Sequence, residues 1–237
     1  MINGKKILAI TLARGGSKKI KKKNIADVCG KPLLQYTTDE VKKSKYIDSY
    51  VVSTDDEEII KVCDKLDVPC WRRGEECASD TATSASALIE ANRNIPSNYD
   101  YIVEIMCTNP LKTVEDIDGC IEKMDNTDAD SVVSVVRVWD HHPSRVKYIE
   151  DDLLKDFYPE IPESRRQDLT PPAYVRNGSI YITKIKSLLE SGVRLSGIVR
   201  PYSMAENNTI NIDELVDLEL ARSLINERNN INGKRKS

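Results

Sequence analysis

Short apolar segments rich in β-branched residues alternate with longer amphipathic segments between residues 6 and 136, and this alternation restricts the possible fold more than any other feature. The apolar segments predict strands at 6–12, 50–54, 69–72, 101–106 and 131–136. The segments between them predict helices at 32–43, after Asp56, at 81–94 and at 114–124. Two strands joined through a helix run parallel, because the connection must cross over the sheet. The sequence therefore predicts an α/β, doubly wound fold with a mostly parallel sheet.

Between residues 139 and 172 this alternation stops, and the stretch carries five of the ten prolines. It also contains apolar and aromatic residues, which argue against simple disorder and favour an inserted arm that covers a site or meets another subunit. The sheet resumes at 179–183, and a last helix is predicted at 214–229. We therefore expect one α/β domain from 1–138 and 173–228, an arm at 139–172, and a frayed basic tail at 229–237.

Composition excludes several classes of protein. The net charge of −3 gives no general attraction to nucleic acid or to anionic membranes. No apolar stretch approaches the ~18 residues of a membrane span, and the short apolar N-terminal segment does not resemble a signal peptide, so we expect a cytoplasmic protein. The six cysteines form no C-x-x-C pair and are expected to be reduced. The His141-His142 pair has no third ligand nearby, so no zinc site is expected.

Basic residues gather directly after the first predicted strand. Seven lysines and arginines lie between Arg14 and Lys31, with Asp27 as the only acidic residue. Gly15 and Gly16 allow backbone N–H groups to approach a phosphate closely. Ligands of open α/β sheets bind outside the carboxyl ends of the strands, which favours a polyphosphate site over a merely solvated loop. The G-x-x-x-x-G-K-[ST] spacing is absent, so this is not a P-loop.

Polar clusters also occur around the later predicted strands. They are Arg73 with Ala78–Thr81, then Thr108–Lys112, Arg176–Ser179 and Asn211–Asp213. Helix capping is an alternative role for the first of these, and a turn explains an Asn-Gly pair by itself. Asn211 and Asp213 alternate on a segment that reads as extended, so their oxygens could share a hard cation such as Mg²⁺.

Seven motifs occur in an order that resembles one known family. They are A-R-G-G-S-K with K-N (13–24), V-V-S-T-D-D (51–56), A-S-D-T-A-T (78–83), T-N-P-L-K (108–112), H-H-P (141–143), R-R-Q-D-L-T-P-P-A-Y-V-R-N-G-S-I-Y-I (165–182) and I-N-I-D-E…D-L (210–218). Across essentially the whole chain this order resembles the acylneuraminate cytidylyltransferases. The resemblance implies a nucleotide-diphospho-sugar transferase-like fold. It also implies a Mg²⁺-dependent reaction of CTP with a nine-carbon keto-acid sugar, and a homodimer whose arm crosses to the partner subunit.

The resemblance also implies roles for individual residues. The residues that it implies for nucleotide binding are Ala13, Arg14, Gly15, Gly16, Ser17, Lys23, Asn24, Arg73, Ser79 and Thr81. Sugar binding falls to Thr108, Asn109, Arg166, Arg176 and Asn177, and metal binding to Asp213 and Asn211. Arg14, Lys23 and Asp213 carry the catalytic roles.

Two positions depart from the family pattern. Asn211 replaces the first aspartate of the D-x-D metal motif and gives up one negative charge, so weaker metal binding is expected. Met106 stands where many members have Gln, so the sugar need not be N-acetylneuraminate. Legionaminic acid and pseudaminic acid are alternatives, with a slight preference for legionaminic acid or a sialic acid.

Two other functions stay open at this point. One is a cytidylyltransferase for the eight-carbon acid 3-deoxy-manno-octulosonate, which the R-N-G-S-I-Y-I segment disfavours. The other is a non-catalytic nucleotide-binding protein that lost a metal ligand at Asn211.

Overall fold

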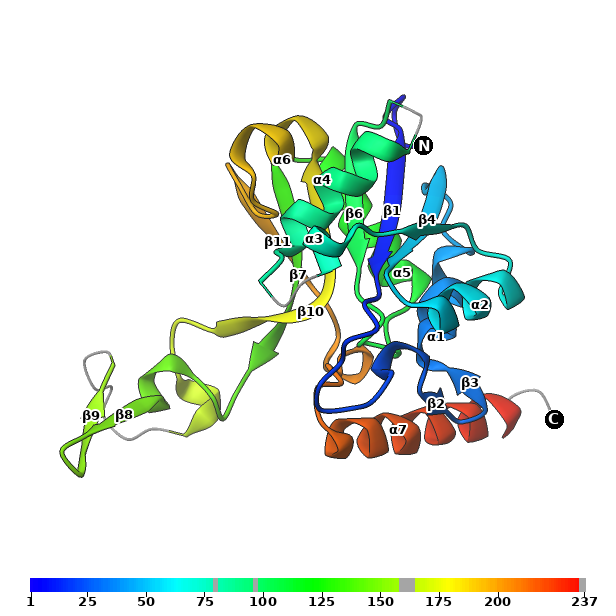
Figure 1. Cartoon of the computed structure of the whole chain (residues 1–237). Helices are drawn as coiled ribbons and strands as arrows, with labels where there is room; N and C mark the ends of the chain where they lie inside the picture. Colours follow the sequence, from blue (N-terminus) through cyan, green and yellow to red (C-terminus); the bar gives the residue numbers. More distant parts are fainter. Residues whose placement is uncertain (79–80, 96–97, 158–164, 235–237) are drawn as a thin grey trace.

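The computed structural model describes residues 1–78, 81–95, 98–157 and 165–234, and its centre is a seven-stranded sheet (Figure 1). The strand order is β11-β7-β10-β6-β1-β4-β5. Pairing is parallel except around β10, which runs antiparallel to both of its neighbours. The strands are β1 (Ile7–Leu12), β4 (Ser49–Thr54), β5 (Cys70–Arg72), β6 (Tyr101–Ile105), β7 (Ser131–Val138), β10 (Ala173–Lys184) and β11 (Val199–Ser203). The predicted doubly wound, mostly parallel sheet is confirmed.

Helices cover both faces of this sheet (Figure 1). One face packs against α1 (Leu33–Val41), α2 (Glu57–Lys65) and α5 (Val114–Asp125), and the other against α4 (Ser84–Asn94) and α6 (Ile185–Ser191). Alternate residues of β1 enter the two layers, with Ile7 on the α5 side and Leu8 on the α4 side. Burial on both faces explains why the parallel strands are apolar throughout.

Helix capping explains where two helices begin. The Asp56 carboxylate accepts hydrogen bonds from the N–H groups of Glu58 and Ile59 at 2.7 and 3.2 Å, as predicted. In α4 the cap is Thr83, so this helix begins three residues later than predicted. A short helix, α3 (Glu75–Ala78), was not predicted.

The second half of the chain departs further from prediction. Strand β10 begins six residues earlier than expected and contains a β-bulge at Gly178, whose φ of 64° is left-handed. The Asn177-Gly178 pair therefore forms a bulge within a strand rather than a turn before one. The short elements α6 and β11 were not predicted.

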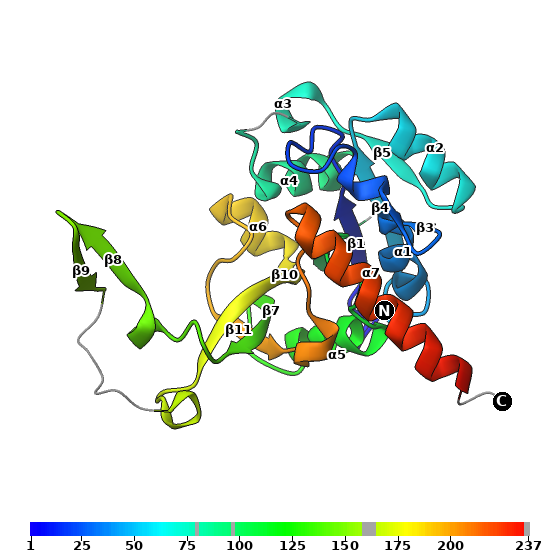
Figure 2. The same cartoon turned by 90° about the horizontal axis from the view of Figure 1, so that it is seen from below.

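The last helix is longer than the sequence indicated. Helix α7 (Leu215–Lys234) includes residues 229–234, which were predicted to fray, so that prediction is wrong. Three α7 side chains (Leu218, Ala221 and Ile225) are buried against Ile20 and Val28, which anchors the helix below the sheet (Figure 2). Residues 235–237 lie outside the described residues.

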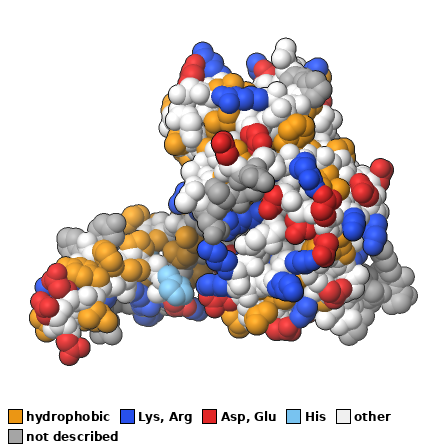
Figure 3. Space-filling model, viewed as in Figure 1, with side chains coloured by type: hydrophobic (Ala, Val, Ile, Leu, Met, Phe, Trp, Pro, Cys, Tyr) orange, Lys and Arg blue, Asp and Glu red, His pale blue; other side chains and the backbone are white. Residues whose placement is uncertain are grey.

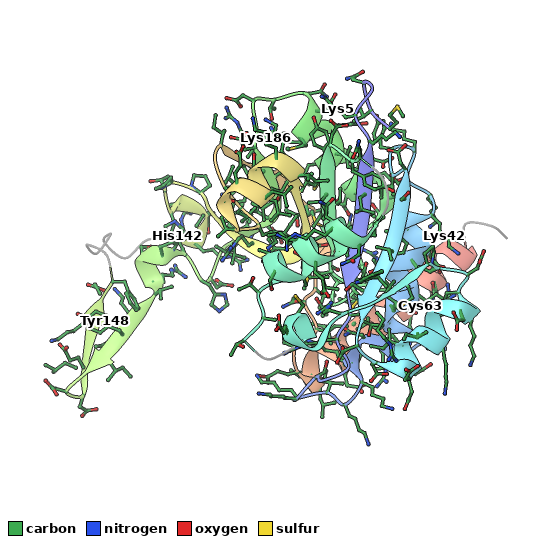
Figure 4. All side chains as sticks on the ribbon, turned by 45° about the horizontal axis from the view of Figure 1, so that its top comes forward. Lys5, Lys42, Cys63, His142, Tyr148 and Lys186 are labelled. Carbon is green, nitrogen blue, oxygen red and sulfur yellow. The ribbon has the colours of Figure 1, made fainter. Side chains whose placement is uncertain are left out.

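The predicted arm leaves the body and ends in a two-stranded hairpin (Figures 1 and 2). The hairpin consists of β8 (Lys147–Glu150) and β9 (Leu153–Asp156). Ile149 and Leu154 face each other across it and are 74% and 72% exposed. Figure 4 shows Tyr148 on the hairpin and His142 at the base of the arm, and Figure 3 shows apolar side chains gathered on this arm.

The remaining elements are small. A hairpin of β2 (Asp27–Val28) and β3 (Lys31–Pro32) precedes α1. Single 3₁₀ turns occur at η1 (Lys23–Ile25), η2 (Pro143–Arg145), η3 (Arg166–Asp168) and η4 (Glu206–Asn208). The six cysteines are free thiols. Within the described residues, none of the helices combines the length and apolarity that crossing a bilayer requires.

Candidate active site

The loops after β1 and β6 enclose, together with the segment before α7, a cavity of about 390 Å³ at the carboxyl edge of the sheet. Four basic residues and a single acidic residue line it. The lining is Leu12, Arg14, Ser17, Lys18, Lys19, Ile20, Lys23, Asn24, Met106, Cys107, Thr108 and Asp213. The excess of positive charge in a confined space suits a polyanion.

Close backbone packing shapes the loop after β1. The Gly15 N–H donates to the Asp55 carboxylate at 3.0 Å, and a Cβ atom at Gly15 would collide with the Asp56 side chain. Glycine is therefore required at this position. Gly16 has no atom within 4 Å of the place where a Cβ would lie, so its backbone is open to an approaching group.

Lys23 connects this loop to the segment that precedes α7. Its ammonium donates to the Asp213 carboxylate at 2.9 Å and to the Ile212 carbonyl at 2.7 Å, and the side chain is only 16% exposed. Nearby, Lys19 donates to Glu214 at 2.5 Å, and this hydrogen bond raises the pKa of Lys19. Both contacts hold basic groups against the segment that precedes α7.

Asn24 is buried and bound to protein at both ends of its amide. Its N–H donates to the Arg14 carbonyl at 2.9 Å, and its oxygen accepts from the Cys107 thiol at 3.0 Å. These two bonds position the Arg14 backbone, while Asn24 also lines the cavity, so its predicted contact with phosphates stays a prediction. Burial raises the pKa of Cys107 to about 11, so this thiol stays protonated and donates.

The loop after β6 contains one unpartnered polar atom. The Thr108 side chain lines the cavity, and its hydroxyl oxygen is buried without a hydrogen-bond partner. Asn109 was predicted to bind substrate, but it is fully buried and its amide is bound by Ser179, the Asn208 carbonyl and the Leu111 N–H. Because protein groups occupy that amide, Asn109 shapes the loop, and Thr108 is the residue of this pair that lines the cavity.

Lys112 ends the same loop in the interior. Its ammonium donates to the hydroxyl of Thr37 at 2.7 Å and also to the Asn109 carbonyl. Burial lowers the pKa of Lys112 to about 7, because charge is costly away from water.

A second cavity of about 250 Å³ adjoins the first and shares Leu12, Arg14 and Met106 with it. Arg73 lines this cavity; it is buried, and it donates to the Ser53 hydroxyl and carbonyl at 3.2 and 2.9 Å. Burial lowers the pKa of Arg73. The predicted Thr81 is exposed, and residues 82–84 line the cavity in its place, while Ser79 lies outside the described residues.

A third cavity of about 370 Å³ lies at the β10 bulge and is lined by Arg176, Asn177 and Asn211 among others. Asn177 accepts from the Ser134 hydroxyl at 2.6 Å and donates to the Thr209 hydroxyl at 3.2 Å, which holds the bulge in place. The predicted sugar-binding Arg166 is not near these residues. It lies on the arm, 3.4 Å from Asp140.

Asn211 and Asp213 are not on a strand, but their side chains do meet. The Asn211 amide donates to the Asp213 carboxylate at 2.5 Å, and the Ile212 N–H between them donates to the Thr108 carbonyl at 2.9 Å. No cluster of three or more Asp, Glu, His or Cys side chains gathers as a metal site in the part of the chain that the structure describes. One carboxylate and one amide suit Mg²⁺ only where substrate phosphates and water complete its shell, which is how Mg²⁺ commonly binds.

Sequence reasoning missed several site residues. Asp217 accepts from the N–H groups of Asp213 and Glu214 at 2.9 and 2.8 Å, and these bonds lower the pKa of Asp217. An acidic residue in the first turn of the last predicted helix was the available signal. Glu104 and Arg194 were also missed and line the second and third cavities, whereas Met106, which the sequence had singled out, lines the first two. An acid inside the otherwise apolar strand Tyr101–Ile105 was the signal for Glu104.

Comparison with known proteins agrees with this geometry. The profile of the cytidylyltransferase family matches residues 8–180. The chain is 32% identical over 228 residues to a pseudaminic acid cytidylyltransferase of Campylobacter jejuni, which covers 92% of this chain and 96% of that protein. It is also 32% identical over 223 residues to N-acylneuraminate cytidylyltransferase A of Danio rerio, covering 92% of this chain and 50% of the relative.

Solved structures support the same fold. A CMP:2-keto-3-deoxy-manno-octonic acid synthetase in complex with CTP superposes with a TM-score of 0.73 at 16% identity, covering 94% of this chain and 99% of the other. A 4-diphosphocytidyl-2C-methyl-D-erythritol synthase from Anaerococcus prevotii superposes with a TM-score of 0.68 at 20% identity, covering 95% and 98% of the two chains. The family profile over residues 8–180 and the 32% identity to a relative of similar length show that the chain belongs to the cytidylyltransferase family of nucleotidyltransferases.

Proposed function

We propose that this enzyme activates a nonulosonic acid with CTP, giving the CMP-sugar and pyrophosphate in the cytoplasm. The observation that carries the proposal is the basic cavity at the loop after β1. It adjoins the second cavity, of about 250 Å³, and lies beside the third cavity at the β10 bulge. Two relatives of this chain are named for pseudaminic acid and for N-acylneuraminate, and they support a nine-carbon acid as the acceptor.

In this proposal the phosphates of CTP lie against Arg14, Ser17 and Lys23, while the base enters the pocket beside Arg73. The anomeric hydroxyl of the sugar attacks the α-phosphate in line, and pyrophosphate leaves. Such transfers are accelerated chiefly by positioning and by charge stabilisation. Fixed cations in a confined pocket supply both, since they need little reorganisation as charge develops.

Asp213, with the Asn211 amide, is the proposed Mg²⁺ ligand. Bound Mg²⁺ would neutralise phosphate charge during transfer. The 58% exposed carboxylate of Asp213 is accessible from the phosphate cavity, and Lys23 beside it orients the carboxylate. Asn211 gives up one negative charge relative to an aspartate, so Asn211→Asp should tighten Mg²⁺ binding.

The sugar is proposed to bind at the third cavity, where the Arg176 guanidinium suits a carboxylate. Arg166 is too remote within one chain to join it. We propose a homodimer in which the arm of one protomer lies on the other, because Ile149 and Leu154 present an apolar surface that a monomer would leave in water.

Pyrophosphate release with CTP and Mg²⁺ tests the proposal. The acceptors would be N-acetylneuraminic, legionaminic and pseudaminic acids, with 3-deoxy-manno-octulosonate as the eight-carbon comparison. We expect release with at least one nine-carbon acid and a lower rate with the eight-carbon acid. Preference for the eight-carbon acid would contradict the acceptor class. CTP binding without release for any acid would instead favour a non-catalytic binding protein, and recovery of turnover in Asn211→Asp would then locate the fault at the metal site.

A further inference from the structure

One carboxylate oxygen of Glu104 lacks a hydrogen-bond partner in the interior. Glu104 interrupts the apolar strand β6 and is 1% exposed. One of its oxygens accepts from the Arg194 guanidinium at 2.5 Å, while the other is buried without a hydrogen-bond partner among the residues that the structure describes. Leaving a buried acceptor unpaired costs on the order of 1–3 kcal/mol, and more for a charged group, so such atoms are rare without a reason.

Glu104 lines the second cavity, next to Arg73 and Met106. The neighbouring Arg73 guanidinium donates to Ser53 and, at 3.4 Å, to the Cys77 carbonyl, and none of its hydrogen bonds within the described residues reaches the unpartnered Glu104 oxygen. Arg194 is fixed on the other side of Glu104, with its guanidinium 3.6 Å from the centre of the Tyr181 ring. The protein thus places the Glu104 carboxylate in the wall of the second cavity. One of its oxygens remains for a hydrogen-bond donor on a bound ligand.

We propose that Glu104 is a specificity-determining residue that accepts a hydrogen bond from the exocyclic amine of cytosine and so favours CTP over UTP. The inference rests on the proposed function, which puts the base of the nucleotide in this cavity. Cytosine offers an N–H donor at the position where uracil has a carbonyl oxygen. A carboxylate attracts the first and repels the second, and a site that reads a polar group discriminates strongly because the mismatch leaves buried groups unpaired.

The test measures nucleotide affinity by titration calorimetry on the full chain, without sugar. The probes are CTP, UTP and the triphosphate of 2-pyrimidinone riboside, which is CTP without its exocyclic amine. The wild type should bind CTP about 10- to 100-fold more tightly than the amine-free analogue, as expected for a bond to a charged acceptor. Glu104→Leu should bind the two with equal affinity, and Glu104→Gln should show a reduced preference for CTP over UTP.

Arg194→Gln is the matched control, because it breaks the same ion pair from the other side and leaves the Glu104 oxygens in place. It should keep the preference for the amine. Thermal melting identifies any variant that fails to fold, and Glu104→Gln, which keeps the shape of the side chain, then carries the test.

Two results would overturn the inference. One is an unchanged preference for CTP in both folded Glu104 variants. The other is an equal loss of preference in Arg194→Gln, which would mean that the ion pair supports the pocket without reading the base. Failure of the proposed function looks different: a wild type that binds neither CTP nor UTP lacks the nucleotide site, and one that binds CTP but releases no pyrophosphate lacks the reaction, whichever base Glu104 prefers.

Discussion

The Lys23 ammonium lies 2.9 Å from the Asp213 carboxylate, although 190 residues separate the two in sequence. The contact joins the loop after β1 to the segment before α7 at the wall of the basic cavity. It also brings together a residue proposed to bind phosphate and the residue proposed to bind Mg²⁺. A cation beside a metal-binding carboxylate orients it and limits its repulsion of the incoming nucleotide.

Replacing Asp213 with Ala should lower turnover by roughly 100-fold or more, because a transition-state charge partner is lost. Glu214→Ala is the matched control, since Glu214 is the next residue, is also 58% exposed and pairs with Lys19. The Glu214→Ala substitution should change turnover little. Initial rates at saturating CTP with equal thermal melting would compare them, and a two-fold loss in Asp213→Ala would remove this residue from the metal site.

Arg14→Ala should weaken CTP binding by about 10- to 100-fold and leave cytidine binding nearly unchanged. The reason is that its proposed partner is a phosphate, and a charge-assisted hydrogen bond is lost. Lys186→Ala on α6, which lies on another part of the surface in Figure 4, serves as the control for a general charge effect. Equal losses of affinity for CTP and cytidine would contradict this placement of Arg14.

Thr108→Val should leave thermal stability unchanged or slightly higher, because the buried hydroxyl has no partner to lose. Ligand affinity should fall. Thr37→Val gives the opposite pattern, since the Thr37 hydroxyl accepts a hydrogen bond from Lys112 and its loss should lower stability by about 1 kcal/mol. Melting and CTP titration of the two variants test this, and unchanged CTP and sugar binding in Thr108→Val would refute a ligand contact.

The buried Lys112 makes stability depend on pH. Its folded pKa of about 7 lies below the ordinary value of 10.5, so the folded state loses this proton first as pH rises. Between these two values the unfolded state binds more protons, and the free energy of unfolding gains about 1.4 kcal/mol per pH unit from this group. Below pH 7 both states are protonated, and the contribution is constant.

Denaturant unfolding of the wild type and Lys112→Met at pH 6, 7.5 and 9 measures this effect. The difference in unfolding free energy should move in favour of the wild type as pH rises above 7. Because both proteins share every other titrating group, a difference that does not change with pH would mean that Lys112 keeps an ordinary pKa.

The double substitution Ile149→Lys and Leu154→Lys should convert the proposed dimer into monomers, because it places two charges on the apolar hairpin. Sedimentation velocity gives the oligomeric state. Lys155→Ala on the same hairpin is the control, as it removes an exposed ion pair with Glu150 and no apolar surface. A dimer that persists in the double variant would exclude this hairpin as the interface.

Local periodicity predicted most of the body. The first five strands lie within two residues of their predicted ends, because burial on both faces leaves a continuous apolar signal. Two of the elements that were missed, α6 and β11, are short and carry exposed residues such as Leu189 and Val199. Both elements are held in place by neighbours that are distant in sequence, so no local pattern of apolar residues predicts them.

By itself, the sequence determined the doubly wound sheet, the basic loop at its carboxyl edge and the family motifs, because each depends on residues close together in the chain. Tertiary structure decided the use of each polar side chain. The Asn109 amide is a motif group bound entirely by protein groups, while Thr108 and Glu104 each hold a buried oxygen without a hydrogen-bond partner among the described residues. The physical reason is that hydrogen-bond satisfaction depends on partners brought from far along the chain, and only the folded structure places them.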